Sequence, residues 1–143
     1  MASRTEQIMA ALLTIVSGTT TAGANAERDR DAPKDGVNCL SVEQGDDEPV
    51  EIQGNILVHK LLNVSVVVWV KKNNTYSTEI NKIINEIYVA VMADRELGLP
   101  DFVGDILPTG VSKPEPYEAG TTLMKAVINF EVMYQHSLTD MSA

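Results

Sequence analysis

The segment ILVHKLLNVSVVVWV, residues 56–70, constrains the fold more than any other part of the chain. Apart from Lys60, every even position is apolar, whereas the odd positions include His59 and Asn63. A period of two indicates a β-strand, because successive side chains point to opposite faces of a sheet. Its fifteen residues exceed the usual strand length of about 5–6. We therefore expect this strand to bend near Asn63 or to project beyond the domain as a hairpin, which would need a partner.

Other segments predict further strands and two amphipathic helices. Residues 122–134 alternate in the same way and predict a second long strand. Apolar residues repeat every three or four positions in residues 5–17 and 78–93, which indicates helices with one buried face. Ser3 and Glu6 form an S-x-x-E capping box at the first helix. Shorter strands are expected at residues 27–31, 37–42 and 103–107.

This order of elements predicts an α+β fold. We expect a single two-layer domain over residues 1–143, with a mainly antiparallel sheet and two helices packed on one face. A chain of 143 residues suits one domain. Residues 1–4 and 137–143 are expected to be flexible ends.

The sheet face opposite the helices would remain unusually apolar. A surface of this kind is typical of contacts with other proteins rather than of a face in open water. We therefore expect an oligomer whose subunit interface contains Leu57, Leu61, Val67, Trp69, Leu123, Val127 and Met133.

The N-terminal residues permit two interpretations. An apolar run at residues 8–16 follows a cation and precedes Ala-Asn-Ala, which is typical of a signal peptide. However, Glu6 lies directly before the run, where a signal peptide requires positive charge. We favour a helix of the folded domain. No apolar run reaches the roughly 18–20 residues that span a bilayer, so no membrane association is expected.

An acidic stretch, SVEQGDDEPVEIQGN at residues 41–55, could be a calcium loop, a catalytic carboxylate cluster or a solvated turn. Its acidic residues are Glu43, Asp46, Asp47, Glu48 and Glu51. The ligand spacing of a helix–loop–helix calcium site fails, because a count from Asp46 places Val50 and Leu57 at ligand positions. Catalysis by paired carboxylates needs a rigid gap, which a segment with Gly45 and Pro49 does not supply. We interpret the stretch as a negative turn that leads into the long strand.

The remaining chemistry points away from an enzyme. The chain has no Walker, dinucleotide-binding, C-x-x-C or G-x-S-x-G motif. Cys39 is the only cysteine, so no intrachain disulfide can form, and we interpret it as a small buried apolar residue. His59 and His136 fall on predicted strands without a nearby Cys or His, which argues against zinc. We expect no catalytic activity, no cofactor and no bound metal.

The formal net charge of −9 limits the possible partners. It argues against binding nucleic acid by neutralising phosphates, which requires a basic surface. An acidic wall would instead repel phosphate and let DNA slide past without adhering.

The sequence pattern resembles a known family over residues 4–136. The similar segments are, in chain order, RTEQIMAALLTIV, AERDR, VNCLSVEQGDDEP, ILVHKLLNVSVVVWV, STEINKIINEIYVAVMADRELG and TTLMKAVINFEVMYQH. Their order and lengths resemble the phage tail terminator family, the minor tail protein U-like or tail-completion proteins of long-tailed phages.

The resemblance implies a structural virion protein assembled in the host cytoplasm. Such proteins form a ring, usually of six copies, that caps the head-proximal end of the tail tube and stops its polymerisation. The ring would contact the tail tube protein and a neck or head-completion protein, and DNA would pass through its lumen. In such a ring the acidic stretch could line or rim the channel. The alternatives are another tail structural protein, either a tube subunit or a neck adaptor, and an acidic cation-binding module at residues 43–51.

Overall fold

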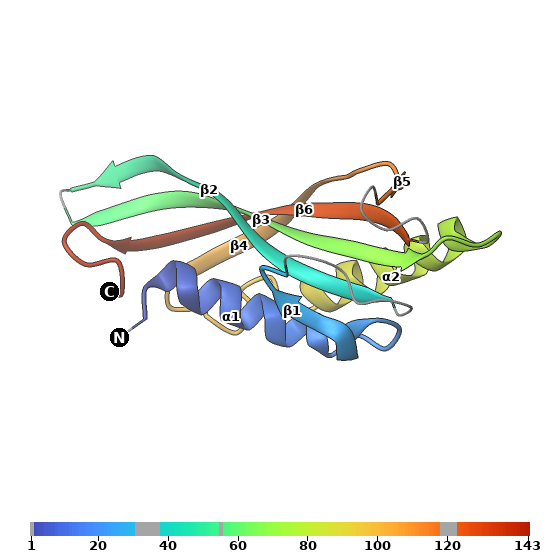
Figure 1. The fold of residues 1–143 in the computed structure, drawn as a ribbon. Coiled ribbons are helices and arrows are strands. Elements are labelled where there is room, and N and C mark those ends of the chain that lie inside the picture. Colours follow the sequence, from blue (N-terminus) through green and yellow to red (C-terminus); the bar gives the residue numbers. More distant parts are fainter. Residues whose placement is uncertain (1, 31–37, 55, 118–122) are drawn as a thin grey trace.

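One mixed sheet and two long helices form the fold in the computed structural model, which describes residues 2–30, 38–54, 56–117 and 123–143. Both helices lie on the same face of the sheet (Figure 1). The predicted α+β domain of two layers is therefore confirmed. The elements are α1 (Arg4–Ser17), the short 3-10 helix η1 (Gly23–Asn25), β1 (Ala26–Arg28), β2 (Cys39–Gln53), β3 (Leu57–Lys71), α2 (Tyr76–Met92), β4 (Val103–Val111), β5 (Glu115–Pro116) and β6 (Leu123–Ser137).

The sheet has the strand order β1-β2-β3-β6-β4, and the short strand β5 also pairs with β6. Only the pairing of β1 with β2 is parallel, and the other described pairings are antiparallel. The strands β2, β3 and β6 each contain 15 residues. This topology confirms the prediction of a mainly antiparallel sheet with two unusually long strands.

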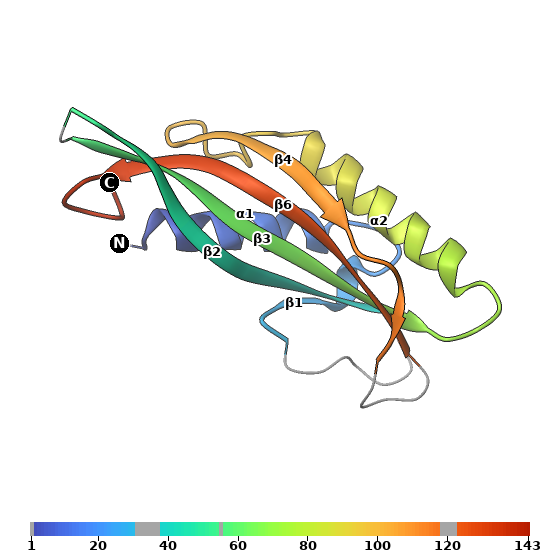
Figure 2. The same ribbon diagram turned by 90° about the horizontal axis from the view of Figure 1, so that it is seen from above.

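The hairpin of the long strands β2 and β3 contains a bulge and projects beyond α1. The pairing of β2 with β3 shifts register between Gln44 and Asp47, so that Gly45 and Asp46 lie opposite Asn63. A bulge of this kind bends the strand that carries the extra residue. Beyond the bulge, the end of the β2–β3 hairpin extends past the start of α1 in both views (Figures 1 and 2). The projecting hairpin expected from the sequence is present.

The main core lies between the helices and the sheet. Its buried side chains come from the predicted helical stripes and from the even positions of β3 and β6. They include Ile8, Met9, Leu12, Val16, Leu62, Val64, Val66, Val68, Ile80, Ile83, Ile87, Val91, Ile128, Phe130 and Val132. Met9 is buried although it lies outside the predicted stripe of α1. Ala11 and Ile15 of that stripe, and Ile84 of the stripe of α2, are only partly buried. The two helical periods therefore identified the core face correctly.

The capping box at α1 is only half formed. The Ser3 hydroxyl accepts a hydrogen bond from the Glu6 amide at 3.2 Å. The Glu6 carboxylate instead accepts hydrogen bonds from the Arg28 guanidinium at 2.6 Å. Glu6 thus fastens α1 to β1.

Several predicted boundaries are wrong. The acidic stretch is not a turn, because residues 39–53 form the continuous strand β2. β1 ends at Arg28, since Asp29 has a φ of 50° and leaves the extended conformation. β4 extends to Val111, four residues past its expected end. Predicted strand residues 31, 37 and 122 lie outside the described residues.

The C-terminal residues, for which the sequence suggests a flexible end, make specific contacts. The Leu138 amide donates to the Ile56 carbonyl at 2.8 Å, and the Arg4 amide donates to the Met141 carbonyl at 2.9 Å. This C-terminal turn therefore lies beside the projecting hairpin and the start of α1.

Candidate interaction surfaces

The strand β2 divides the acidic residues between two faces of the sheet. Residues directly opposite each other on antiparallel strands share a face. Glu43, Glu48 and Glu51 pair with odd-numbered residues of β3, so they lie on the face away from the helices, which we call the open face. Asp47 pairs with the buried Leu62 and lies on the helix-covered face. The five acidic residues therefore do not form one uniform loop.

Asp47 is the centre of a polar cluster formed by three strands. Its carboxylate accepts a hydrogen bond from Lys60 Nζ at 2.9 Å and from the Tyr134 hydroxyl at 2.8 and 2.9 Å. The Lys60 and Asp47 side chains are only 13% and 17% exposed. Burial, reinforced by the Asp47 carboxylate, raises the pKa of Tyr134 well above its usual value. The cluster explains why Lys60 interrupts the apolar face of β3.

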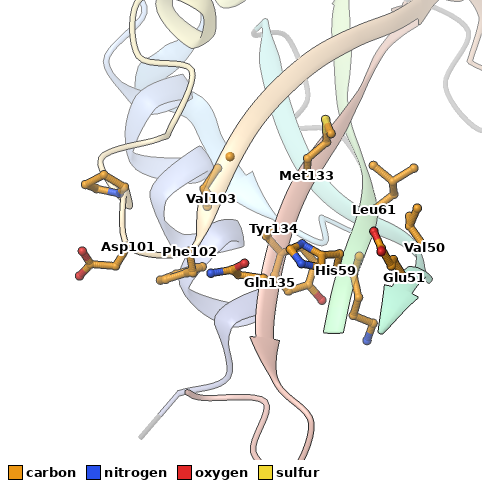
Figure 3. A pocket seen from close by; sticks show the side chains of 13 residues that line it. Val50, Glu51, His59, Leu61, Asp101, Phe102, Val103, Met133, Tyr134 and Gln135 are labelled. Carbon is orange, nitrogen blue, oxygen red and sulfur yellow. The ribbon is translucent and has the colours of Figure 1, made fainter. Parts of the chain in front are cut away.

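The open face contains a groove at the hairpin end of the sheet, with a volume of about 470 Å³ (Figure 3). Apolar side chains from three strands meet there: Val50 of β2, Leu61 of β3 and Met133 of β6. Residues 100–104, before and at the start of β4, form the opposite wall. Val50 is 63% exposed and Met133 is 44% exposed. Two of the predicted interface residues, Leu61 and Met133, thus lie together on an accessible surface.

Val50 was missed from the sequence because acidic residues surround it. The feature that places Val50 is the bulge between Pro49 and Glu51, which inserts Val50 as an extra residue in β2 and is seen only in the structure. A simple period of two cannot follow a strand through such an insertion.

The prediction that Val67, Trp69 and Leu123 form a subunit interface is wrong for this chain. All three side chains are at most 4% exposed. Val67 and Trp69 form a second buried cluster with Cys39, against which Tyr117 packs. The rings of Trp69 and Tyr117 meet edge to face, with centroids 6.4 Å apart.

The physical reason is that the chain after β4 continues along β6 and brings the Tyr117 ring against Trp69. β5 pairs with β6, and the Tyr117 amide donates to the Leu123 carbonyl at 3.0 Å. No regular element is predicted from the sequence for this proline-rich segment. Of the other predicted interface residues, Leu57 and Val127 are half-buried. Cys39 is fully buried, as expected.

A second groove of about 400 Å³ lies between α2 and β4. Its apolar lining includes Ile84 and Tyr88 from α2, and Pro108 and Val111 from β4. Tyr88 and Val111 are 42% and 55% exposed. This α2–β4 groove was not predicted, because Ile84 reads as a core residue and β4 was expected to end before Pro108.

A pair of charged residues fixes β4 relative to the end of α2. The Arg95 guanidinium donates two hydrogen bonds to the Asp105 carboxylate, at 2.7 and 2.6 Å. These bonds hold the pKa of Asp105 below its usual value and raise that of Arg95. The ion pair therefore constrains the relative position of α2 and β4, which form the two walls of the α2–β4 groove.

Among residues 2–30, 38–54, 56–117 and 123–143, no group of three or more His, Cys, Asp or Glu side chains is arranged to hold a metal ion. Within that part of the chain, no helix combines the length and the apolar character needed to cross a membrane. A scan of protein-family models and a search of curated proteins gave no match to this sequence.

Proposed function

We propose that this protein is a structural ring protein of phage tails, which caps the head-proximal end of the tail tube. In that role it stops tube polymerisation and joins the tail to neck or head-completion proteins. The proposal rests on the resemblance of the element order to tail terminators and on the surfaces that the folded chain leaves uncovered.

The observation that carries the proposal is the exposed apolar end of the β2–β3 hairpin. Val50, Ile52 and Ile56 are 63%, 57% and 68% exposed at a projecting end of the molecule. Val50 lines the open-face groove, whereas Ile52 pairs with Val58, so the hairpin end exposes apolar side chains on both of its faces. Exposed apolar surface of this kind is typical of protein–protein contact sites. Because β6 pairs with β3 as far as Leu57, the hairpin end is supported within the chain, so its exposed apolar side chains are what favours assembly into an oligomer.

Charge on the open face supports the passage of DNA through the ring. Glu43, Glu48 and Glu51 share this face with Glu131 of β6. A lumen lined by such a face would repel phosphate and would not retain DNA. The net charge of −9 acts in the same direction.

The first test is the mass and shape of the purified full chain. Native mass spectrometry and electron microscopy should show one closed ring of uniform stoichiometry, with six copies as the expected number. A monomer that persists at tens of micromolar would overturn the proposal. Long open filaments would favour a tube subunit instead.

A further inference from the structure

We infer that copies of this chain join head to tail, with the β2–β3 hairpin end of one copy seated in the α2–β4 groove of the next. The part of the hairpin end that enters the contact consists of Ile52 and Ile56, and the groove is the one lined by Ile84, Tyr88, Pro108 and Val111. The inference rests on the proposed function and names the contact that would close the ring.

The two surfaces differ in shape. The hairpin end projects past α1, whereas the α2–β4 groove is a hollow of about 400 Å³. Sites that bind small molecules have volumes of about 300–1,000 Å³, so the hollow has room for a few apolar side chains. A projecting apolar end and a hollow that can receive apolar side chains therefore occur on the same chain.

The positions of the two surfaces favour a repeating contact. In both views the hairpin end and α2 lie toward opposite ends of the molecule (Figures 1 and 2). Two different patches on one chain form a heterologous interface. Such an interface repeats from copy to copy, and it gives a ring where the rotation closes and an open filament where it does not.

Charge selects the α2–β4 groove over the groove on the open face. Each copy carries a net charge of −9, so copies repel each other, and a contact free of like charge adds least to that repulsion. The open-face groove includes Glu51 and Asp101, which would face the acidic residues of an incoming hairpin, and the charge of Lys60 in its lining is already paired with Asp47. None of the described residues that line the α2–β4 groove is charged at neutral pH.

The test uses one variant for each surface. Ile52→Glu with Ile56→Glu alters the hairpin, and Val111→Glu alters the groove; all three positions are more than half exposed, so the fold should persist. Val89→Glu is the matched control, since Val89 is 59% exposed on α2 but does not line the groove. Circular dichroism and the midpoint of thermal unfolding verify folding. A milder hairpin variant, Ile52→Thr with Ile56→Thr, keeps β-branched residues should the glutamates disturb the strand.

Mixing the variants distinguishes this contact from any other. By native mass spectrometry, each surface variant alone should associate at least 100-fold more weakly than the unaltered chain, and the control should still form rings. An equimolar mixture of hairpin and groove variants retains one intact hairpin and one intact groove. It should therefore form a dimer containing one copy of each variant.

The outcomes separate this inference from the proposed function. Rings formed by every variant would overturn the inference and leave the ring function standing. Surface variants that stay monomeric even when mixed would also overturn the pairing of these two surfaces. An unaltered chain that remains monomeric would overturn the proposed function, and the inference with it.

Discussion

Asp47 shows how a single residue can differ from its acidic neighbours. Its carboxylate is shared between Lys60 and Tyr134, and so links β2, β3 and β6 beside the hairpin end. Removing one partner of a largely buried ion pair leaves the other charge without compensation, which costs more than losing an exposed pair. Asp46 lies in the bulge and is exposed. The two adjacent aspartates should therefore respond differently to the same substitution.

We expect Asp47→Asn to lower the free energy of unfolding by about 1–3 kcal/mol, because Lys60 loses its counter-charge and the charged acceptor becomes neutral. Asp46→Asn is the matched control and should change the free energy by less than about 0.5 kcal/mol. Urea unfolding followed by circular dichroism measures both. Equal effects at the two positions would contradict the assignment of a structural role to Asp47.

At the scale of elements, the sheet protects both of its outer strands from pairing with other strands. Among the described residues, β1 pairs with β2 only at residues 40–42, which leaves the outer edge of β2 open from Glu43 to Gln53. β4 is the last strand at the other side of the sheet.

Both of these edge strands contain features that oppose pairing. β2 contains Pro49 and two register shifts, and β4 contains Pro108 and two register shifts. Prolines, charges and bulges are the features by which natural proteins prevent edge-to-edge aggregation. Self-assembly should therefore use side-chain surfaces.

Removing this protection from β2 should convert controlled assembly into aggregation. Pro49→Val with Glu51→Thr restores a backbone donor and removes a charge at the open edge. We expect larger and heterogeneous species in light scattering, with increased thioflavin T fluorescence. Pro100→Val removes a proline from an exposed loop and serves as the control. Unchanged particle size in the edge variant would show that the edge is not an assembly hazard.

For the whole molecule, charge opposes assembly while apolar surface favours it. The chain has 20 acidic and 11 basic residues, and three acidic residues of β2 lie on one face of the sheet. Copies brought together by uncharged surfaces still repel each other over the range of the Debye length, which is about 10 Å at 0.1 M salt. The strength of assembly should therefore depend on ionic strength in a specific direction.

We expect the ring to become more stable as sodium chloride rises from about 0.05 to 0.5 M, because salt screens the repulsion between copies. Analytical ultracentrifugation at several protein concentrations measures the change. A Glu43→Gln, Glu48→Gln, Glu51→Gln variant should show a weaker salt dependence. Dissociation at high salt would indicate that ion pairs hold the copies together, contrary to an apolar contact.

The sequence by itself determined the two-layer architecture, because the strand period and the helix period can both be recognised from residues that are close together in the chain. The period of two at residues 56–70 and the period near 3.6 in α1 and α2 identified the faces that meet in the core. The same alternation indicated that the opposite face was partly apolar, and the length of the segment indicated that the strand would either bend near Asn63 or project as a hairpin. These properties depend on residues close together in the chain, so no knowledge of distant contacts was needed.

Only the tertiary structure decided which apolar residues remain exposed and which acidic residue is paired. Tyr117 covers Trp69 although 48 positions separate them, and Asp47 bonds to Tyr134 from 87 positions away. The bulges in β2 shifted the alternation that would have placed Val50 and Asp47 on their faces. Such contacts depend on the strand register and on where the chain runs after β4. A local pattern of residue types does not encode them.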